Sequence, residues 1–279
     1  MRFMDSIERL VPAVLGRSAR NYLDARAWRR LQPPLQFDNS NLRRVSHVDL
    51  ASAMNDPAIG AAFTEDHAAI AEVFGVGEIA GGVNPGDRRA LYQLVGHFKP
   101  RRVLEIGTYV GASTVHIASA LRRFVEQGTL CTADIVDVNG PQGAWRSFGM
   151  QQPPAGIISD LGLEPITTFI NKPAATVLAS PDQRFDMIFL DGDHSRVAVY
   201  REISAALPAL NPNGLIVLHD FYPDGKPLVP GGNVEFGPAA AASRIARETD
   251  ALAFLPLGNL PWPTKNGSKA TSLALVSRR

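Results

Sequence analysis

The chain has 279 residues, 45% of them hydrophobic, and its 28 basic and 27 acidic residues leave a formal net charge of +1. This composition suffices for one large buried core. The balanced charge argues against a general attraction to nucleic acid or anionic membranes. The one cysteine, Cys131, excludes an intrachain disulfide framework. It lies in an apolar run, where we expect a buried thiol rather than a nucleophile.

Neither a membrane-spanning segment nor a secretory signal is indicated by the sequence. No apolar stretch approaches the roughly 20 residues that a spanning helix needs. Charges at Arg2, Asp5, Glu8 and Arg9 interrupt the apolar core that a signal peptide would have. We therefore expect a cytoplasmic protein without a membrane partner.

The first 75 residues differ in texture from the rest and predict a helical N-terminal extension. Residues 1–50 are rich in arginine, and the spacing of Ile7, Leu10 and Val14 fits an amphipathic helix. An isolated short helix is only marginally stable, so this apolar face needs a partner. We expect the extension to be a lid or a contact within a homo-oligomer rather than a nucleic-acid-binding arm.

The next segment predicts a helix with clear start and stop signals. Asn84-Pro85-Gly86-Asp87 begins this helix, and the apolar residues at positions 91, 94, 95 and 98 share one face of it. Lys99-Pro100 ends it, because proline disfavours helix in the residue that precedes it.

From residue 101 onward, short apolar strands alternate with helices. We expect strands at residues 103–106, 129–133, 166–170, 187–190 and 215–218 and near 253–257 and 272–276, with a helix at 113–124. Such alternation is typical of a mostly parallel sheet, here seven-stranded, with helices on both faces. Residues 76–279 are therefore predicted to form one α/β domain of the Rossmann-like type.

The loop after the first of these strands favours one class of cofactor. Within residues 105–111, Gly107 permits backbone conformations closed to other residues, and Gly111 lets a ligand approach the start of the helix. A dinucleotide-binding loop has another glycine where this chain has Tyr109, whose side chain would obstruct a pyrophosphate. Glu105 would repel a pyrophosphate but suit an ammonium or sulfonium group. The loop therefore favours S-adenosylmethionine over NAD.

Asp134 follows the second strand directly. A carboxylate at this position can accept hydrogen bonds from both ribose hydroxyls of an adenosine; the alternative is a solvated aspartate at the strand end. Trp145 and Phe148, in the following loop, could stack on adenine or pack in the core or a lid.

The ends of the fourth and fifth strands carry aspartates and histidines. Asp191 and His194 follow the fourth strand, and His219 and Asp220 the fifth. Parallel strands bring these ends to the same edge of the sheet as the glycine loop. Asp191 and Asp220 could hold a hard divalent cation, which would lower the pKa of a substrate hydroxyl while His194 takes its proton. The alternative is a metal-free site in which Asp191 orients His194 or His219. The histidines at positions 47, 67, 97 and 116 are expected to pack in or on helices.

Two stretches of the chain resemble known methyltransferases. Residues 103–113 look like the first motif of the catechol O-methyltransferase type. Residues 190–195, followed by Pro212-Asn213-Gly214 and His219-Asp220, resemble the bacterial class 24 methyltransferases, relatives of the macrocin and cephalosporin-pathway O-methyltransferases. The resemblance covers about residues 80–279 and implies a class I S-adenosylmethionine-dependent enzyme with a Rossmann-like methyltransferase fold.

The resemblance also implies roles for individual residues. The cofactor would be bound by Glu105, Gly107, Thr108, Tyr109, Gly111, Ser113, Asp134 and Asp191. Asp191 and Asp220 match two carboxylates that bind Mg²⁺ in the catechol enzyme, and His194 falls at the position of its catalytic lysine. Phe221 replaces the asparagine that supplies the third metal ligand there, so His219 is the candidate substitute.

The leading interpretation is O-methylation of a small-molecule hydroxyl in a natural product, sugar or phenol, assisted by Mg²⁺ or another divalent cation. A metal-independent O- or N-methyltransferase with a histidine–aspartate base is the alternative. An NAD-dependent oxidoreductase is disfavoured by Tyr109. A non-catalytic cofactor-binding subunit is disfavoured by the intact set of Asp191, His194, His219 and Asp220.

Overall fold

The computed structural model describes residues 17–32, 35–74, 82–180 and 183–279. A seven-stranded sheet crosses the centre of the molecule in the order β3-β2-β1-β4-β5-β7-β6. Its strands are β1 (Arg102–Ile106), β2 (Thr129–Asp134), β3 (Thr167–Asn171), β4 (Phe185–Leu190), β5 (Leu210–Leu218), β6 (Leu252–Pro256) and β7 (Ala274–Arg278). β7 alone runs in the opposite direction to the other six strands. The mostly parallel seven-stranded sheet predicted from the sequence is therefore confirmed.

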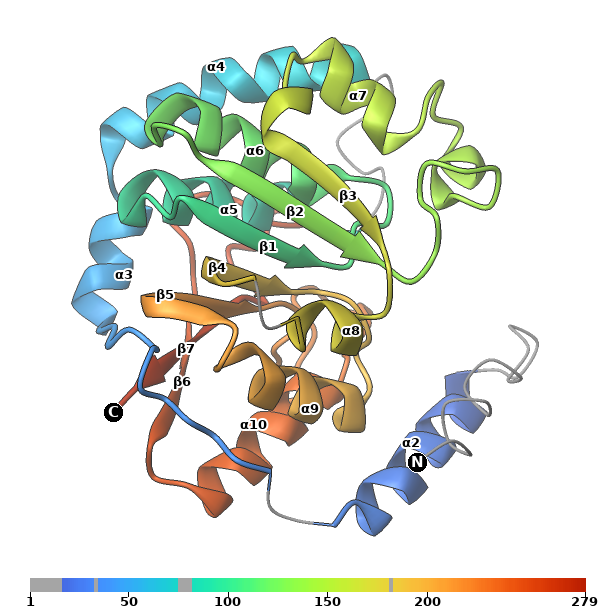
Figure 1. Cartoon of the computed structure of the whole chain (residues 1–279), viewed down its shortest axis with the longest axis vertical. Coiled ribbons are helices and arrows are strands. Elements are labelled where there is room, and N and C mark those ends of the chain that lie inside the picture. Colours follow the sequence, from blue (N-terminus) through green and yellow to red (C-terminus); the bar gives the residue numbers. More distant parts are fainter. Residues whose placement is uncertain (1–16, 33–34, 75–81, 181–182) are drawn as a thin grey trace.

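Helices cover both faces of the sheet (Figure 1). One face carries α3 (His47–Met54), α4 (Pro57–Phe74), α5 (Pro85–Phe98), α6 (Ala112–Phe124) and α7 (Pro154–Asp160), and the other carries α8 (Ala174–Leu178), α9 (Arg196–Ala206) and α10 (Gly237–Glu248). Alternate strand residues face opposite sides. Val103 and Met187 thus lie in one buried core, and Leu104 and Ile188 lie in the other.

The predicted helix after residue 84 forms for the local reasons that the sequence indicates. The Asn84 side chain accepts a hydrogen bond from the backbone N–H of Asp87, which caps α5, and Pro85 occupies the first turn. Lys99 adopts the left-handed conformation at the other end, with φ of 51°. The helix predicted around Ile7 and Val14 lies outside the described residues.

The residues before 76 contact both layers of helices. Helix α2 (Arg17–Arg30) packs against α9, and α3 and α4 pack against α5. Between α2 and α3, residues 41–43 pair with Gly214 in the middle of β5. Leu42 is buried in one core and Val45 in the other, so this segment passes from one face of the sheet to the other. None of the helices within the described ranges is long and apolar enough to cross a membrane.

Candidate active site at the carboxyl ends of the strands

The strand order reverses between β1 and β4, which is where ligands bind in open α/β sheets. Backbone hydrogen bonds join the strand ends at this edge. Gly107 N–H donates to Ala133, Asp191 N–H to Ile106, and His219 N–H to Leu190. Gly107 has φ of +99°, and a Cβ atom there would lie 2.2 Å from the carbonyl oxygen of Asp191. The glycine loop and the loop after β4 therefore touch through backbone atoms, and only glycine fits at position 107.

Glu105 is fully buried at the end of β1. Its two carboxylate oxygens accept hydrogen bonds from the hydroxyl groups of Ser113 (2.5 Å), Thr114 (2.6 Å) and Thr132 (2.6 Å). Burial raises the pKa of Glu105 to about 7, because desolvation outweighs these three hydroxyl donors. The structure thus brings Glu105 and Ser113 together, and their contact with the cofactor stays a prediction.

Tyr109 and Asp134 are linked directly. Asp134 Oδ2 accepts a hydrogen bond from the backbone N–H of Tyr109 at 3.0 Å, and its Oδ1 accepts one from Val136. Tyr109 has φ of +51°, and its exposed ring meets the edge of Phe148 at a centroid distance of 5.7 Å. Gly111, at the N-terminal cap of α6, has φ of +80°. Glycine-loop residues thus stand beside the aspartate at the end of β2.

A cavity of about 200 Å³ opens next to Asp134, beyond the ends of β2 and β3. It is lined by Thr108, Thr132, Asp134, Val136, Asp137, Val138, Asn139, Phe169, Ile170 and Asn171. Two of these residues, Thr108 and Asp134, were predicted from the sequence to bind the cofactor. The cavity lies on the side of the glycine loop where the prediction places adenosine.

Asp191, His219 and Asp220 converge at the ends of β4 and β5. One potential ligand atom from each of them lies within 4.8 Å of the others. His219 Nδ1 is 2.8 Å from Asp191 Oδ1 and 3.6 Å from Asp220 Oδ1. The ring is 8% exposed, and within the described part of the chain neither ring nitrogen has a hydrogen bond of acceptable geometry. A buried imidazole nitrogen beside two carboxylates is a donor set suited to a divalent cation.

The two carboxylates of the cluster determine the charge of His219. Burial by itself would lower the pKa of His219, but the carboxylates of Asp191 and Asp220 outweigh it and hold the pKa well above its ordinary value. A protonated ring therefore partly neutralises the carboxylates when no cation is bound.

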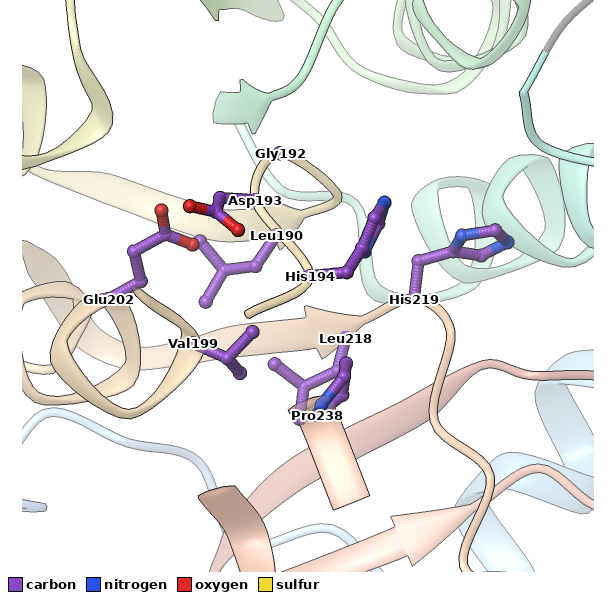
Figure 2. A pocket seen from close by; sticks show the side chains of 9 residues that line it. All are labelled: Leu190, Gly192, Asp193, His194, Val199, Glu202, Leu218, His219 and Pro238. Atoms are coloured by element: carbon purple, nitrogen blue, oxygen red, sulfur yellow. The ribbon is translucent and has the colours of Figure 1, made fainter. Parts of the chain in front are cut away.

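His194 lies at the open side of the same cluster. Its Nε2 is 3.6 Å from Asp220 Oδ2 and 4.0 Å from Asp191 Oδ1, and its side chain is about one-third exposed. Figure 2 shows His219 just past the end of β5 and His194 on the loop that follows β4; Asp193 and Glu202 line a small pocket together with both histidines. That pocket has a volume of only about 10 Å³, which holds no more than about one water molecule.

Solved structures of methyltransferases share this fold. A protein assigned as an O-methyltransferase from Klebsiella pneumoniae superposes with a TM-score of 0.52 at 20% identity, over 94% of this chain and 98% of that one. The O-methyltransferase from Bacillus cereus in complex with S-adenosylhomocysteine gives 0.51 at 17% identity, over 84% and 98%. Podospora anserina methyltransferase PaMTH1, bound to the same ligand, gives 0.50 at 16% identity, over 89% and 100%. At these identities, the comparisons establish a shared fold.

A family model described as a methyltransferase domain matches residues 104–221. That span runs from β1 to the end of β5 and contains every residue of the glycine loop and the acidic cluster. The match identifies residues 104–221 as a methyltransferase domain. No curated protein sequence matches it significantly.

Phe221, which replaces the asparagine ligand of the catechol enzyme, has a packing role. Its ring is buried and stacks on Phe254 of β6, with the ring planes 10° apart. Phe221 therefore faces the core rather than the acidic cluster.

Sequence reasoning missed Asp87. This carboxylate is fully buried at the start of α5, and its Oδ2 lies 3.4 Å from His219 Nε2. It accepts hydrogen bonds from the Thr271 hydroxyl and from the Asn84 amide at 2.7 Å. The available signal was an acidic residue in the first turn of a helix, which ordinary capping explains.

Proposed function

We propose that this methyltransferase transfers the methyl group of S-adenosylmethionine to a hydroxyl group of a small molecule, with a divalent cation bound by Asp191, His219 and Asp220. One observation carries the proposal. Three potential ligand atoms lie within 4.8 Å of one another, one of them on a buried imidazole whose nitrogens make only ion-pair contacts with carboxylates. The cluster shares its sheet edge with the glycine loop, so a cofactor and an acceptor bound there would be neighbours.

In this proposal the glycine loop binds the methionine part of the cofactor. At Gly107, Thr108 and Gly111 the cofactor would contact the backbone. Glu105 and Ser113 would contact its ammonium group. Tyr109 would lie at the edge of the site. Asp134 would accept the ribose hydroxyls at the edge of the 200 Å³ cavity. Asp191, whose backbone touches Gly107, stands between the cofactor and the cation site.

The acceptor chemistry follows from the acidic cluster. A bound cation, with Mg²⁺ as the family expectation, would lower the pKa of the acceptor hydroxyl. His194, whose Nε2 is open to one side of the cluster, would take the proton. Transfer neutralises the alkoxide and the sulfonium, so holding the two groups in line supplies much of the rate. The structural relatives described as O-methyltransferases support an oxygen acceptor.

A second mechanism is supported by one contact. His219 Nδ1 lies 2.8 Å from Asp191 Oδ1, which suits a metal-free site in which a histidine–aspartate pair is the base for O- or N-methylation. We further propose that residues 1–75 are a lid or a homo-oligomer contact on the cofactor-binding domain of residues 76–279.

The cofactor half of the proposal is tested by calorimetry. S-adenosylhomocysteine should bind with a dissociation constant in the micromolar range or below. Asp134→Ala should weaken this binding by ~1–3 kcal/mol, because charge-assisted hydrogen bonds to the ribose are lost. Asp250→Ala, a control at a fully exposed aspartate, should bind like the wild type. Tight binding of NAD without binding of S-adenosylhomocysteine would contradict the assignment of the cofactor site.

The chemical half needs the same titration beside a methyl-transfer assay with a panel of small hydroxylated acceptors. Asp220→Asn, or EDTA, should abolish transfer while leaving S-adenosylhomocysteine affinity nearly unchanged, because the cofactor lies over β1 and β2. His194→Ala should lower the rate by ~10²–10⁴-fold. Full transfer in EDTA, with His194→Ala still impaired, would replace the cation with the metal-free base.

A further inference from the structure

We infer that the cation site of this methyltransferase selects a first-row transition dication, such as Co²⁺ or Mn²⁺, over Mg²⁺, because His219 supplies a nitrogen ligand whose orientation Asp87 sets. The inference rests on the proposed cation site and names the chemical class of the cation and a positioning residue outside the family-matched segment.

The ligand set is what distinguishes this site from an all-oxygen one. Asp191 and Asp220 offer carboxylate oxygens, whereas the third atom within 4.8 Å is an imidazole nitrogen. The residue after Asp220 contributes nothing, since Phe221 is buried against Phe254. Within the described ranges, no other group of three or more histidine, cysteine or acidic side chains meets as closely.

Cation preference follows from ligand chemistry. Mg²⁺ is small and hard, and it prefers oxygen ligands in near-ideal octahedral geometry. Imidazole nitrogen suits transition dications, whose affinity for mixed nitrogen and oxygen sites rises from Mn²⁺ through Co²⁺. Replacing an oxygen ligand by His219 should therefore shift the preference away from Mg²⁺ while two carboxylates still supply the negative charge.

Asp87 is placed to fix the ring of His219. A cation among Asp191, Asp220 and His219 requires the lone pair of Nδ1, so the ring proton must reside on Nε2. The Asp87 carboxylate lies 3.4 Å from Nε2, whereas Asp191 lies 2.8 Å from the other ring nitrogen, Nδ1. Histidine ligands commonly donate their second N–H to such a carboxylate, which sets the tautomer and the ring orientation.

The surroundings of Asp87 hold it in that place. It is fully buried, and its oxygens accept hydrogen bonds from Thr271 and Asn84. Thr271 and Asn84 come from segments that flank β7 and α5, so the carboxylate is fixed from two sides. It touches neither Asp191 nor Asp220 by any hydrogen bond found among the described residues, so Asp87 is a positioning residue.

The test uses the full chain, stripped of metal and saturated with S-adenosylhomocysteine, and titrated with Co²⁺, Mn²⁺ and Mg²⁺ separately. Co²⁺ should bind at least tenfold more tightly than Mg²⁺, and pulsed EPR of the Mn²⁺ complex should show coupling to one histidine nitrogen. His219→Asn, which supplies an amide oxygen instead, should remove the nitrogen coupling and reduce the Co²⁺-to-Mg²⁺ preference at least tenfold.

Asp87→Asn keeps the shape of the side chain but weakens its role as an acceptor. It should lower Co²⁺ affinity about 10–100-fold and change the visible spectrum of bound Co²⁺, without altering S-adenosylhomocysteine affinity. Thr271→Val, which removes one of the hydrogen bonds that hold Asp87, should change the Co²⁺ spectrum less than Asp87→Asn does. Asp250→Ala, at a fully exposed aspartate, is the control and should leave the spectrum unchanged.

The possible outcomes distinguish failure of this inference from failure of the proposed function. Equal binding of Co²⁺ and Mg²⁺ without nitrogen coupling would overturn the inference and leave a cation-assisted enzyme. Absence of binding by all three cations, with S-adenosylhomocysteine still bound, would overturn both the inference and the cation in the proposed function. An Asp87→Asn spectrum identical to that of the wild type would overturn the positioning role.

Discussion

Glu105 is a carboxyl group whose ionisation is opposed by folding. Its pKa is about 7 in the folded protein against an ordinary 4.5, because burial penalises the charged form. Between these values the folded chain binds more protons than the unfolded chain. The contribution to stability is therefore fully present below pH 4.5 and is lost as the pH rises through 7.

At pH 8 that loss amounts to about 3 kcal/mol, at 1.36 kcal/mol for each pKa unit. Glu105→Gln, which keeps the side-chain shape without the charge, should therefore gain stability relative to the wild type by up to this amount between pH 4.5 and pH 8. Urea unfolding of both proteins without cofactor measures the difference. Parallel pH dependences for the two proteins would show that Glu105 is not held as a high-pKa acid.

Helix α2 is attached to the site through one aspartate. Both carboxylate oxygens of Asp24 accept hydrogen bonds from Arg196, one from its backbone N–H at 3.1 Å and one from its guanidinium at 2.6 Å. Arg196 begins α9, directly after the loop that carries Asp191 and His194. Further along α2, Trp28 packs on Tyr200 of α9 and on the guanidinium of Arg244 in α10, so other contacts also hold the helix.

Asp24→Ala should remove the contact with Arg196 and leave the contacts of Trp28 in place. Losing two charge-assisted hydrogen bonds should destabilise α2 locally by ~1–3 kcal/mol and speed amide hydrogen exchange there, while β1 and β4 exchange as before. Arg26→Ala, at an exposed position of the same helix, is the matched control. Identical exchange in the two variants would mean that the Arg196 contact does not hold the helix.

At the scale of the whole molecule, a second buried group changes stability with pH in the opposite direction to Glu105. His116 on α6 is buried, with its ring nitrogens contacting His67 at 3.0 Å and the Ala112 carbonyl at 2.7 Å. Burial lowers its pKa to about 3, from an ordinary 6.5. The unfolded chain then binds the proton more readily, so this contribution to stability is present above pH 6.5 and is lost as the pH falls toward 3.

The two groups should therefore cancel between pH 4.5 and pH 6.5, where Glu105 favours low pH and His116 favours high pH. His116→Asn should make the remaining protein lose stability with rising pH in that window, with a change in slope of up to about 1.4 kcal/mol per pH unit. Unfolding free energies at half-unit pH intervals would reveal this change. The same slope in wild type and variant would contradict a neutral, buried His116.

Local patterns determined much of this protein. The cap at Asn84, the stop at Lys99 and the alternation of apolar strands with helices depend on neighbouring residues, and these elements form as predicted. The exception is β5, which begins at Leu210, five residues before the predicted start. The assembly of Asp191, His219 and Asp220 could also be predicted, because parallel strands bring their carboxyl ends to one edge.

Tertiary structure alone decided what surrounds these groups. Asp87 and His219 are far apart in sequence, and no periodicity predicts that the first turn of α5 stands behind the end of β5. The complete burial of Glu105 depends on hydroxyl groups from α6 and β2. The position of Leu42 in one core and of Val45 in the other depends on the pairing of their segment with Gly214 of β5. Sequence patterns encode which face of a single helix or strand is apolar. The burial of a side chain and its pKa depend on contacts between elements, which form only when the whole chain packs.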